Sequence, residues 1–340
     1  HYGRDTPEEI LTGEGNQGSI MGRVGSLISL GRFKFPVKGK KSDDEKETRK
    51  PIELSKNLAN IHTMHGGKEG FDKKIWKCTS IEKSTEENGI SLVEIIFQYI
   101  STDCEEGFPG QLNTQVSYKI QYDPKGLLES NIPVCQLSWK ITATTDKKTI
   151  VNMTNHGYWN LEGVRSSIKD MKFQVYNPHY FLKYSNPLLV FKSILIKLGF
   201  RFLRRNLDIK TFSITPIEQF GIDLTKKHSF KHILKKFCKL DHNIIFSENL
   251  KYKPNEERAL QKVASLYSER NNLRMDFHTT EPCVIIFTSL GKQLNGSEAI
   301  CIEPIRPTNS INIPELRDWV ILSPDNRYFN KTQINFFSTI

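Results

Sequence analysis

One short stretch of the chain combines a titratable ring with amide, hydroxyl and aromatic side chains. His156 lies within Met153–Leu161, MTNHGYWNL, beside Thr154 and Asn155 and close to two large aromatic residues. An imidazole titrates near neutral pH and can act as a general acid or base, and aromatic rings can stack on a sugar face. This composition is typical of a sugar site, although a strand end with a simply hydrogen-bonded histidine would show the same residues.

A carboxylate, Glu303, stands in a second such stretch, Cys301–Asn312, CIEPIRPTNSIN. It follows a run of apolar residues that predicts a strand, so its side chain should project from that strand into a partly enclosed site. Desolvation there would raise the pKa of the carboxyl group toward the range in which it exchanges protons near neutral pH. Glu303 is therefore a candidate acid or base.

The elements that must position these side chains are predicted to be β-strands. Between residues 90 and 145 apolar residues alternate with a period of two, as in Val116–Tyr122 and Leu137–Ala143. This is the pattern of half-buried antiparallel strands that belong to a sheet packed on one side. A chain of 340 residues is long enough for two average domains or for one large β-sandwich.

The net charge and the cysteine spacing limit the kinds of partner and the cellular compartment that we expect. The net charge of +10 would suit an acidic partner, but no compact basic motif with interleaved aromatic residues is present, which argues against nucleic acid. The cysteines show no CxxC spacing, which argues against a zinc site and predicts reduced thiols in a cytoplasmic protein. They are Cys78, Cys104, Cys135, Cys238, Cys283 and Cys301.

The stretch around His156 resembles the TNHxYFNL signature of the galactose mutarotases, or aldose 1-epimerases. Further stretches between residues 18 and 340 agree with that family in the same order, and they look closest to fungal-type members. They are Gly18–Phe35 (family GATIGRxANRIxxGxF), Met64–Trp76 (LHGGxxGFDKRxW), Ser101–Gly110 (SPDGEEGYPG), Leu240–Ile245 (DHNF), Thr279–Pro282 (TTQP) and Cys301–Asn312 (CLEPxxxxDAIN).

The resemblance implies an all-β fold, a single large antiparallel β-sandwich of the galactose mutarotase type that occupies the whole chain, with a sugar groove on one sheet. It implies that Glu303 is the general base on the C1 hydroxyl of an aldose and His156 the general acid on the ring oxygen. His65 would assist at the ring oxygen, and Asp241 and Glu281 would orient sugar hydroxyls. Interconverting the two anomers of galactose or glucose in this way needs no cofactor and no metal.

The chain departs from the family pattern at several positions. The family's sugar-binding arginine falls on Leu27 and the asparagine before it on Ser26, while Asn309 replaces an aspartate. An arginine offers forked donors to sugar hydroxyls and a leucine offers none, so we expect this exchange to lower affinity or change specificity. The N-terminal strands of the family are largely missing, which predicts a fragment or an incomplete first sheet.

Residues 187–209 have no counterpart in the family pattern. This segment is rich in large apolar residues, and Lys197, Arg201, Arg204 and Arg205 would gather on one arc of a helix. It predicts a basic amphipathic helix that either binds a membrane surface or a protein partner, or lies across the sandwich with its basic side in water. The apolar run is broken too often to span a bilayer.

Three functions therefore compete. The leading one is a working aldose 1-epimerase. The second is a non-catalytic sugar-binding or regulatory relative, which Leu27 and the short N-terminus would favour. The third is a hexose-phosphate epimerase, which ranks last because the motifs supply only Arg23 and Arg306 for a phosphate.

Overall fold

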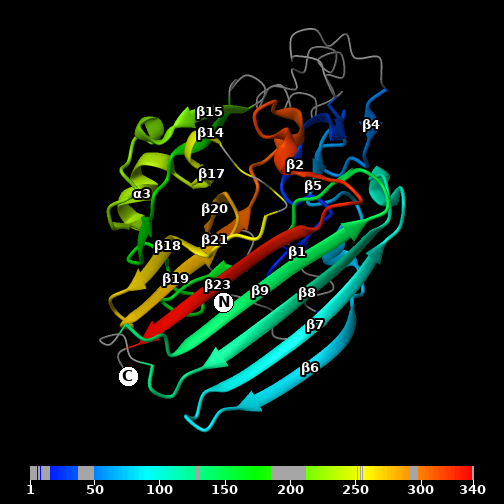
Figure 1. Cartoon of the computed structure of the whole chain (residues 1–340). Coiled ribbons are helices and arrows are strands. Elements are labelled where there is room, and N and C mark those ends of the chain that lie inside the picture. Colours follow the sequence, from blue (N-terminus) through cyan, green and yellow to red (C-terminus); the bar gives the residue numbers. More distant parts are fainter. Residues whose placement is uncertain are drawn as a thin grey trace.

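Two antiparallel sheets of unequal size make up most of the molecule (Figure 1). The computed structural model describes residues 6, 8, 16–36, 50–126, 131–184, 212–250, 252, 254, 256–290 and 298–338. The predicted basic helix at residues 187–209 lies outside these ranges. Within them, none of the helices has the length and apolar character that a membrane span requires.

The larger sheet has nine strands, and apolar side chains on one of its faces form half of the core. Trp139, Ile141, Phe277 and Ile334 are buried there, and burying each such side chain stabilises the fold by about 1.5–3 kcal/mol. In spatial order the strands are β16 (His228–Ser229), β13 (Lys172–Val175), β18 (Gln261–Ser268), β19 (Leu273–Thr279), β23 (Tyr328–Ser338), β9 (Cys135–Thr145), β8 (Leu112–Tyr122), β7 (Ser91–Ser101) and β6 (Lys77–Thr85).

The smaller sheet has six strands and supplies the other half of the core. Its inner face carries Ile244, Val284, Ile286, Ile300 and Ile302, which lie in the same apolar cluster as the side chains of the larger sheet. In spatial order the strands are β12 (Tyr158–Trp159), β21 (Glu298–Ile305), β20 (Cys283–Leu290), β17 (Asp241–Ile245), β14 (Tyr180–Tyr184) and β15 (Phe212–Pro216). The predicted antiparallel β-sandwich is therefore confirmed.

Short strand pairs and single turns of helix lie between the longer strands along the chain. The pairs are β1 (Ile20–Met21) with β11 (Thr154–Asn155), β2 (Leu27–Ile28) with β5 (Thr63–Met64), β3 (Arg32–Phe33) with β4 (Ile52–Glu53), and β10 (Thr149–Ile150) with β22 (Ile321–Leu322). The 3-10 turns are η1 (Ser29–Gly31), η2 (Phe71–Lys73), η3 (Glu105–Gly107), η5 (Ile217–Phe220), η6 (Glu248–Leu250), η7 (Ser310–Asn312) and η8 (Arg317–Trp319).

Helix α3 (Phe230–Phe237) follows β16 and packs against the core through Phe230 and Ile233. It begins where the side chain of Ser229 accepts a hydrogen bond from the backbone N–H of His232, which satisfies one of the free donors of the first turn. Ser229 therefore stabilises the start of the helix beside β13.

Candidate active site

Glu303 lies on β21 in the smaller sheet, and its side chain points away from the core. Ile300 and Ile302 of the same strand face the core, so the alternation of strand side chains places Cys301 and Glu303 on the outer face. Glu303 pairs with Ile285 of β20 and is only 3% exposed. Glu303 thus lies on a strand and is buried, as the sequence predicts, and its place in a sugar site stays a prediction.

His156 reaches the same face from the short connection between β11 and β12. Its backbone N–H donates to the carbonyl of Ser19, and its carbonyl accepts from Gly18, so the β1 segment holds it in place. The ring Nε2 lies 3.4 Å from Oε1 of Glu303. The Tyr158 ring is 5.1 Å away and tilted against the imidazole.

His65 approaches the pair from the loop after β5, and the ring centroids of His65 and His156 are 5.3 Å apart. The backbone N–H of Ser26 donates to Nδ1 of His65 at 3.1 Å. Because Nδ1 accepts, the proton of the neutral ring is on Nε2. Burial, together with His156, lowers the pKa of His65 to about 3, so this side chain is a neutral hydrogen-bond donor near pH 7.

The turn that carries His65 depends on glycine. Gly66 has φ +91°, and a Cβ at this position would lie 1.8 Å from the carbonyl oxygen of Gly22. Only glycine allows so close an approach between the two loops. Gly66 therefore lets this turn bring His65 to the sheet.

Asp241 begins β17 and lies at the rim of the site. Asp241 pairs with Phe287, and Phe287 pairs with Cys301, so their side chains share the outer face with Glu303. The carboxyl group reaches solvent, yet desolvation by its surroundings still raises its pKa. His65, His156, Asp241 and Glu303 thus gather on one face of one sheet.

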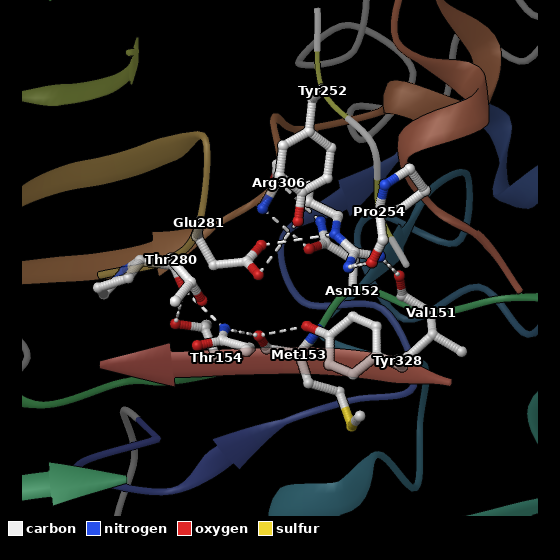
Figure 2. Close-up of polar contacts among 12 residues, drawn as sticks. Val151, Asn152, Met153, Thr154, Tyr252, Pro254, Thr280, Glu281, Arg306 and Tyr328 are labelled. Carbon is white, nitrogen blue, oxygen red and sulfur yellow. Dashed lines mark hydrogen bonds and ion pairs between the residues drawn. The ribbon is translucent and has the colours of Figure 1, made fainter. Parts of the chain in front are cut away.

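Glu281 lies elsewhere on this face. It is two residues before β20 begins, whereas Glu303 pairs with Ile285, which separates the two backbones by about 13 Å along the strand. Figure 2 shows its carboxylate facing the Arg306 guanidinium, and Oε2 of Glu281 lies 3.5 Å from Nε of Arg306. That Glu281 contacts the sugar on which His156 and Glu303 are predicted to act remains a prediction.

Protein groups on all sides hold the Arg306 guanidinium. It donates to the carbonyls of Val151 and Pro254 and lies over the rings of Tyr252 and Tyr328, at 5.5 and 4.3 Å (Figure 2). Burial raises the pKa of Glu281 to about 7, against the opposing effect of Arg306. Glu281 also lines a cavity of about 780 Å³ beside Tyr176, Arg258 and Lys262.

Burial shifts both members of the His156–Glu303 pair toward their neutral forms. It raises the pKa of Glu303 to about 8, with a smaller contribution from the charge of Asp241. It lowers the pKa of His156 to about 4. Between these two values the pair binds one proton, which is the state that combines one acid with one base.

His156, Cys301 and Glu303 also form a group whose ligand atoms lie within 4.8 Å of one another. Histidine, cysteine and glutamate are all zinc ligands. However, Cys301 Sγ contacts Nδ1 of the ring and Glu303 Oε1 lies near Nε2. One ion binds one ring nitrogen, whereas the contacts in the structure pair the thiol and the carboxylate with different ring nitrogens.

Sequence reasoning missed Cys301 as a member of the site, whereas it counted the aromatic residues beside His156, Tyr158 among them. Cys301 is two residues before Glu303, and strand alternation alone could have placed it on the same face. Tyr158 pairs with Cys301 across β12 and β21. This pairing joins segments far apart in the chain and left no signal in the sequence.

Two departures from the family pattern have structural explanations. Leu27 packs against the apolar cluster that contains Tyr252 and Cys283, so it adds an apolar wall and no donor. Asn309 is buried, and its Oδ1 accepts from Ser29 N–H and from the Asn312 side chain. Asn309 therefore anchors a turn.

The match to known families decides the identity of the chain. Residues 26–335 match the family model described as aldose 1-epimerase. The chain belongs to the aldose 1-epimerase family. Among its relatives, rat galactose mutarotase is 26% identical over 336 residues, which cover 94% of this chain and 78% of the rat protein.

Other members of the aldose 1-epimerase family and solved structures agree. The Escherichia coli aldose 1-epimerase is 30% identical over 163 residues, which cover 48% of this chain and 38% of that enzyme. A galactose mutarotase and aldose epimerase homologue from C. elegans has a TM-score of 0.69 at 19% identity, covering 100% of this chain and 88% of its own. A galactose 1-epimerase from Lactobacillus acidophilus has a TM-score of 0.65 at 18% identity, covering 98% and 83%. These two likenesses establish the galactose mutarotase-like fold.

Proposed function

We propose that this protein is an aldose 1-epimerase that interconverts the α and β anomers of an aldohexose such as galactose or glucose. One observation carries the proposal. A buried imidazole and a buried carboxyl group face each other at 3.4 Å. Their shifted pKa values leave one proton on the pair near neutral pH. Family membership supports the same reaction.

Ring opening needs one proton removed from the C1 hydroxyl and one added to the ring oxygen. In the carboxylate–imidazolium form of the pair, Glu303 takes the proton of the C1 hydroxyl and His156 gives its Nε2 proton to the ring oxygen. The bond between C1 and the ring oxygen breaks, and C1 becomes an aldehyde carbon. The pair is left as carboxylic acid and neutral imidazole, so its total number of protons is unchanged.

Ring closure reverses these steps after rotation about the C1–C2 bond. The imidazole removes the proton from the ring hydroxyl, and Glu303 returns its proton to the aldehyde oxygen as the other face of C1 is attacked. His65 supports both directions, since its Nε2–H is a fixed neutral donor for the ring oxygen. Asp241 at the rim would hold sugar hydroxyls in place.

Neither arginine of the motifs supports the hexose-phosphate alternative. Arg23 is 1% exposed and donates to the carbonyls of Pro109, Gly110 and Thr102. Arg306 is 2% exposed and faces Glu281. Both guanidinium groups are occupied by the protein.

The test is the rate at which fresh α-D-galactose or α-D-glucose reaches anomeric equilibrium, followed by polarimetry. The wild-type protein should accelerate it, and Glu303→Gln should reduce the acceleration about 100- to 10,000-fold. Glu298→Gln is the matched control, because Glu298 lies on the same strand and contacts Ser167 and Ile168 instead. A wild-type rate equal to that of the buffer would reject the proposal.

A further inference from the structure

Cys301 contacts His156 and lies beside Glu303. Its Sγ lies 3.4 Å from Nδ1 of His156, and the side chain is fully buried at 0% exposure. The ligand atoms of Cys301, His156 and Glu303 all lie within 4.8 Å of one another. The three side chains therefore lie together, with the thiol next to Nδ1 of the ring and the carboxylate next to Nε2.

The proposed reaction sets a condition on this ring. If Nε2 gains and loses the catalytic proton, Nδ1 must keep its own proton throughout and needs an acceptor for it. In the described part of the chain, Cys301 Sγ is the atom that hydrogen-bonds to Nδ1.

The thiol has its own proton to donate. Burial and the charge of Glu303 raise the pKa of Cys301 well above that of a free thiol, so the group stays protonated. A carboxylate oxygen of Glu303 lies within 4.8 Å of this sulfur, and the interaction with Cys301 lowers the pKa of Glu303, against the effect of burial. This is the direction expected when S–H donates to the carboxylate.

We propose that Cys301 is a positioning residue that accepts Nδ1–H of His156 and donates its S–H to Glu303, so that Nε2 is the nitrogen that exchanges the proton. This inference rests on the proposed function. A neutral thiol sets the tautomer without adding a negative charge next to the ring. A carboxylate in its place would stabilise the imidazolium and raise the pKa of His156.

The test compares Cys301→Ala and Cys301→Ser with Cys283→Ala. Cys283 is equally buried on the neighbouring strand β20, and its thiol donates to the carbonyl of Val284. We expect Cys301→Ala to lower kcat for galactose anomerisation roughly five- to tenfold, with KM within about twofold, as for the loss of one or two hydrogen bonds. Its alkaline pH limb should move upward, because Glu303 loses a donor.

Cys301→Ser keeps a donor and an acceptor and should restore most of the rate, whereas Cys283→Ala should match the wild type. If the alanine variant fails to fold, the serine variant can still be compared with the wild type. Unchanged kcat and an unchanged pH profile in Cys301→Ala would overturn the inference.

A second measurement separates this inference from the proposed function. Long-range ¹H–¹⁵N correlation spectra of the wild-type protein near pH 6.5 should show His156 protonated at Nδ1, and Cys301→Ala should show a mixture of tautomers. A wild-type ring with a bare Nδ1 would refute the role of Cys301. If the wild type does not accelerate anomerisation, the proposed function fails. The spectra then still test whether Cys301 sets the tautomer of His156.

Discussion

Two buried ionisable pairs lie in or beside the smaller sheet, and their chemistry differs. His156 and Glu303 face each other at 3.4 Å, and both can gain or lose a proton in the range that enzymes use. Glu281 instead faces Arg306, whose guanidinium group stays charged at every pH a protein meets. In the first pair both members can exchange a proton with a substrate, while in the second only Glu281 titrates and Arg306 keeps its charge.

The shared proton predicts a bell-shaped pH dependence of kcat/KM for galactose. Below about pH 4 the pair binds a second proton on His156, and above about pH 8 it loses the last one from Glu303. Activity should fall on both sides, which polarimetry between pH 3.5 and 9 can measure. Asp241→Asn should move the alkaline limb to lower pH, because the charge of Asp241 raises the pKa of Glu303. A profile that stays flat across this range would contradict the shared-proton mechanism.

The Arg306–Glu281 pair predicts a stability effect. Arg306→Met leaves a buried carboxylate without its cation, which should lower the free energy of unfolding by about 3–5 kcal/mol. The double variant Arg306→Met, Glu281→Gln removes both charges and should recover a large part of that loss. Urea unfolding gives the free energy of unfolding of the wild type, the single variant and the double variant. A single variant within about 1 kcal/mol of the wild type would show that the pair contributes little.

At the scale of elements, the sequence predicts the long strands between residues 90 and 145 and the strand before Glu303, and it misses the short strands. The alternation at Leu137–Ala143 gives strand β9, whose Trp139 and Ile141 are buried as expected. In β8 the same pattern ends at Ile120 and Tyr122, which are about half exposed at 50% and 49%. Alternation marks a strand, but it does not show where the second layer stops covering it. Two-residue strands such as β11 and β12 carry no period at all.

The turn after β5 gives a prediction at this scale. Gly66→Ala places a Cβ 1.8 Å from the carbonyl oxygen of Gly22 at φ +91°, so the loop must shift and carry His65 away from the sheet. We expect kcat to fall at least tenfold and the protein to lose roughly 1–3 kcal/mol of stability. Gly163→Ala is the control, because its φ is +103° and its nearest neighbour is 3.9 Å away. Equal activity losses in both variants would refute the role of the close approach.

At the scale of the whole molecule, the motifs predict the fold and the candidate pair His156 and Glu303, because each motif resembles a stretch of the family pattern in the same order along the chain. The contact between Cys301 and His156 joins positions 145 residues apart, and the pair of Glu281 and Arg306 depends on how two strand ends meet. Such contacts follow from the register of distant strands. No local pattern in the sequence encodes that register.

The buried carboxyl groups also make the stability of the whole fold depend on pH. The pKa of Glu303 rises from about 4.5 to about 8 on folding, so the folded state binds more protons than the unfolded state between these values. The free energy of unfolding therefore falls as pH rises through this window, by up to about 1.4 kcal/mol per pH unit for one such group. The glutamine of Glu303→Gln cannot ionise. From pH 5 to pH 8 the wild type should therefore lose unfolding free energy relative to this variant. Urea titrations at pH 5, 6.5 and 8 measure this difference. A difference that stays constant would mean that Glu303 titrates alike in the folded and unfolded states and is not desolvated by the sheet.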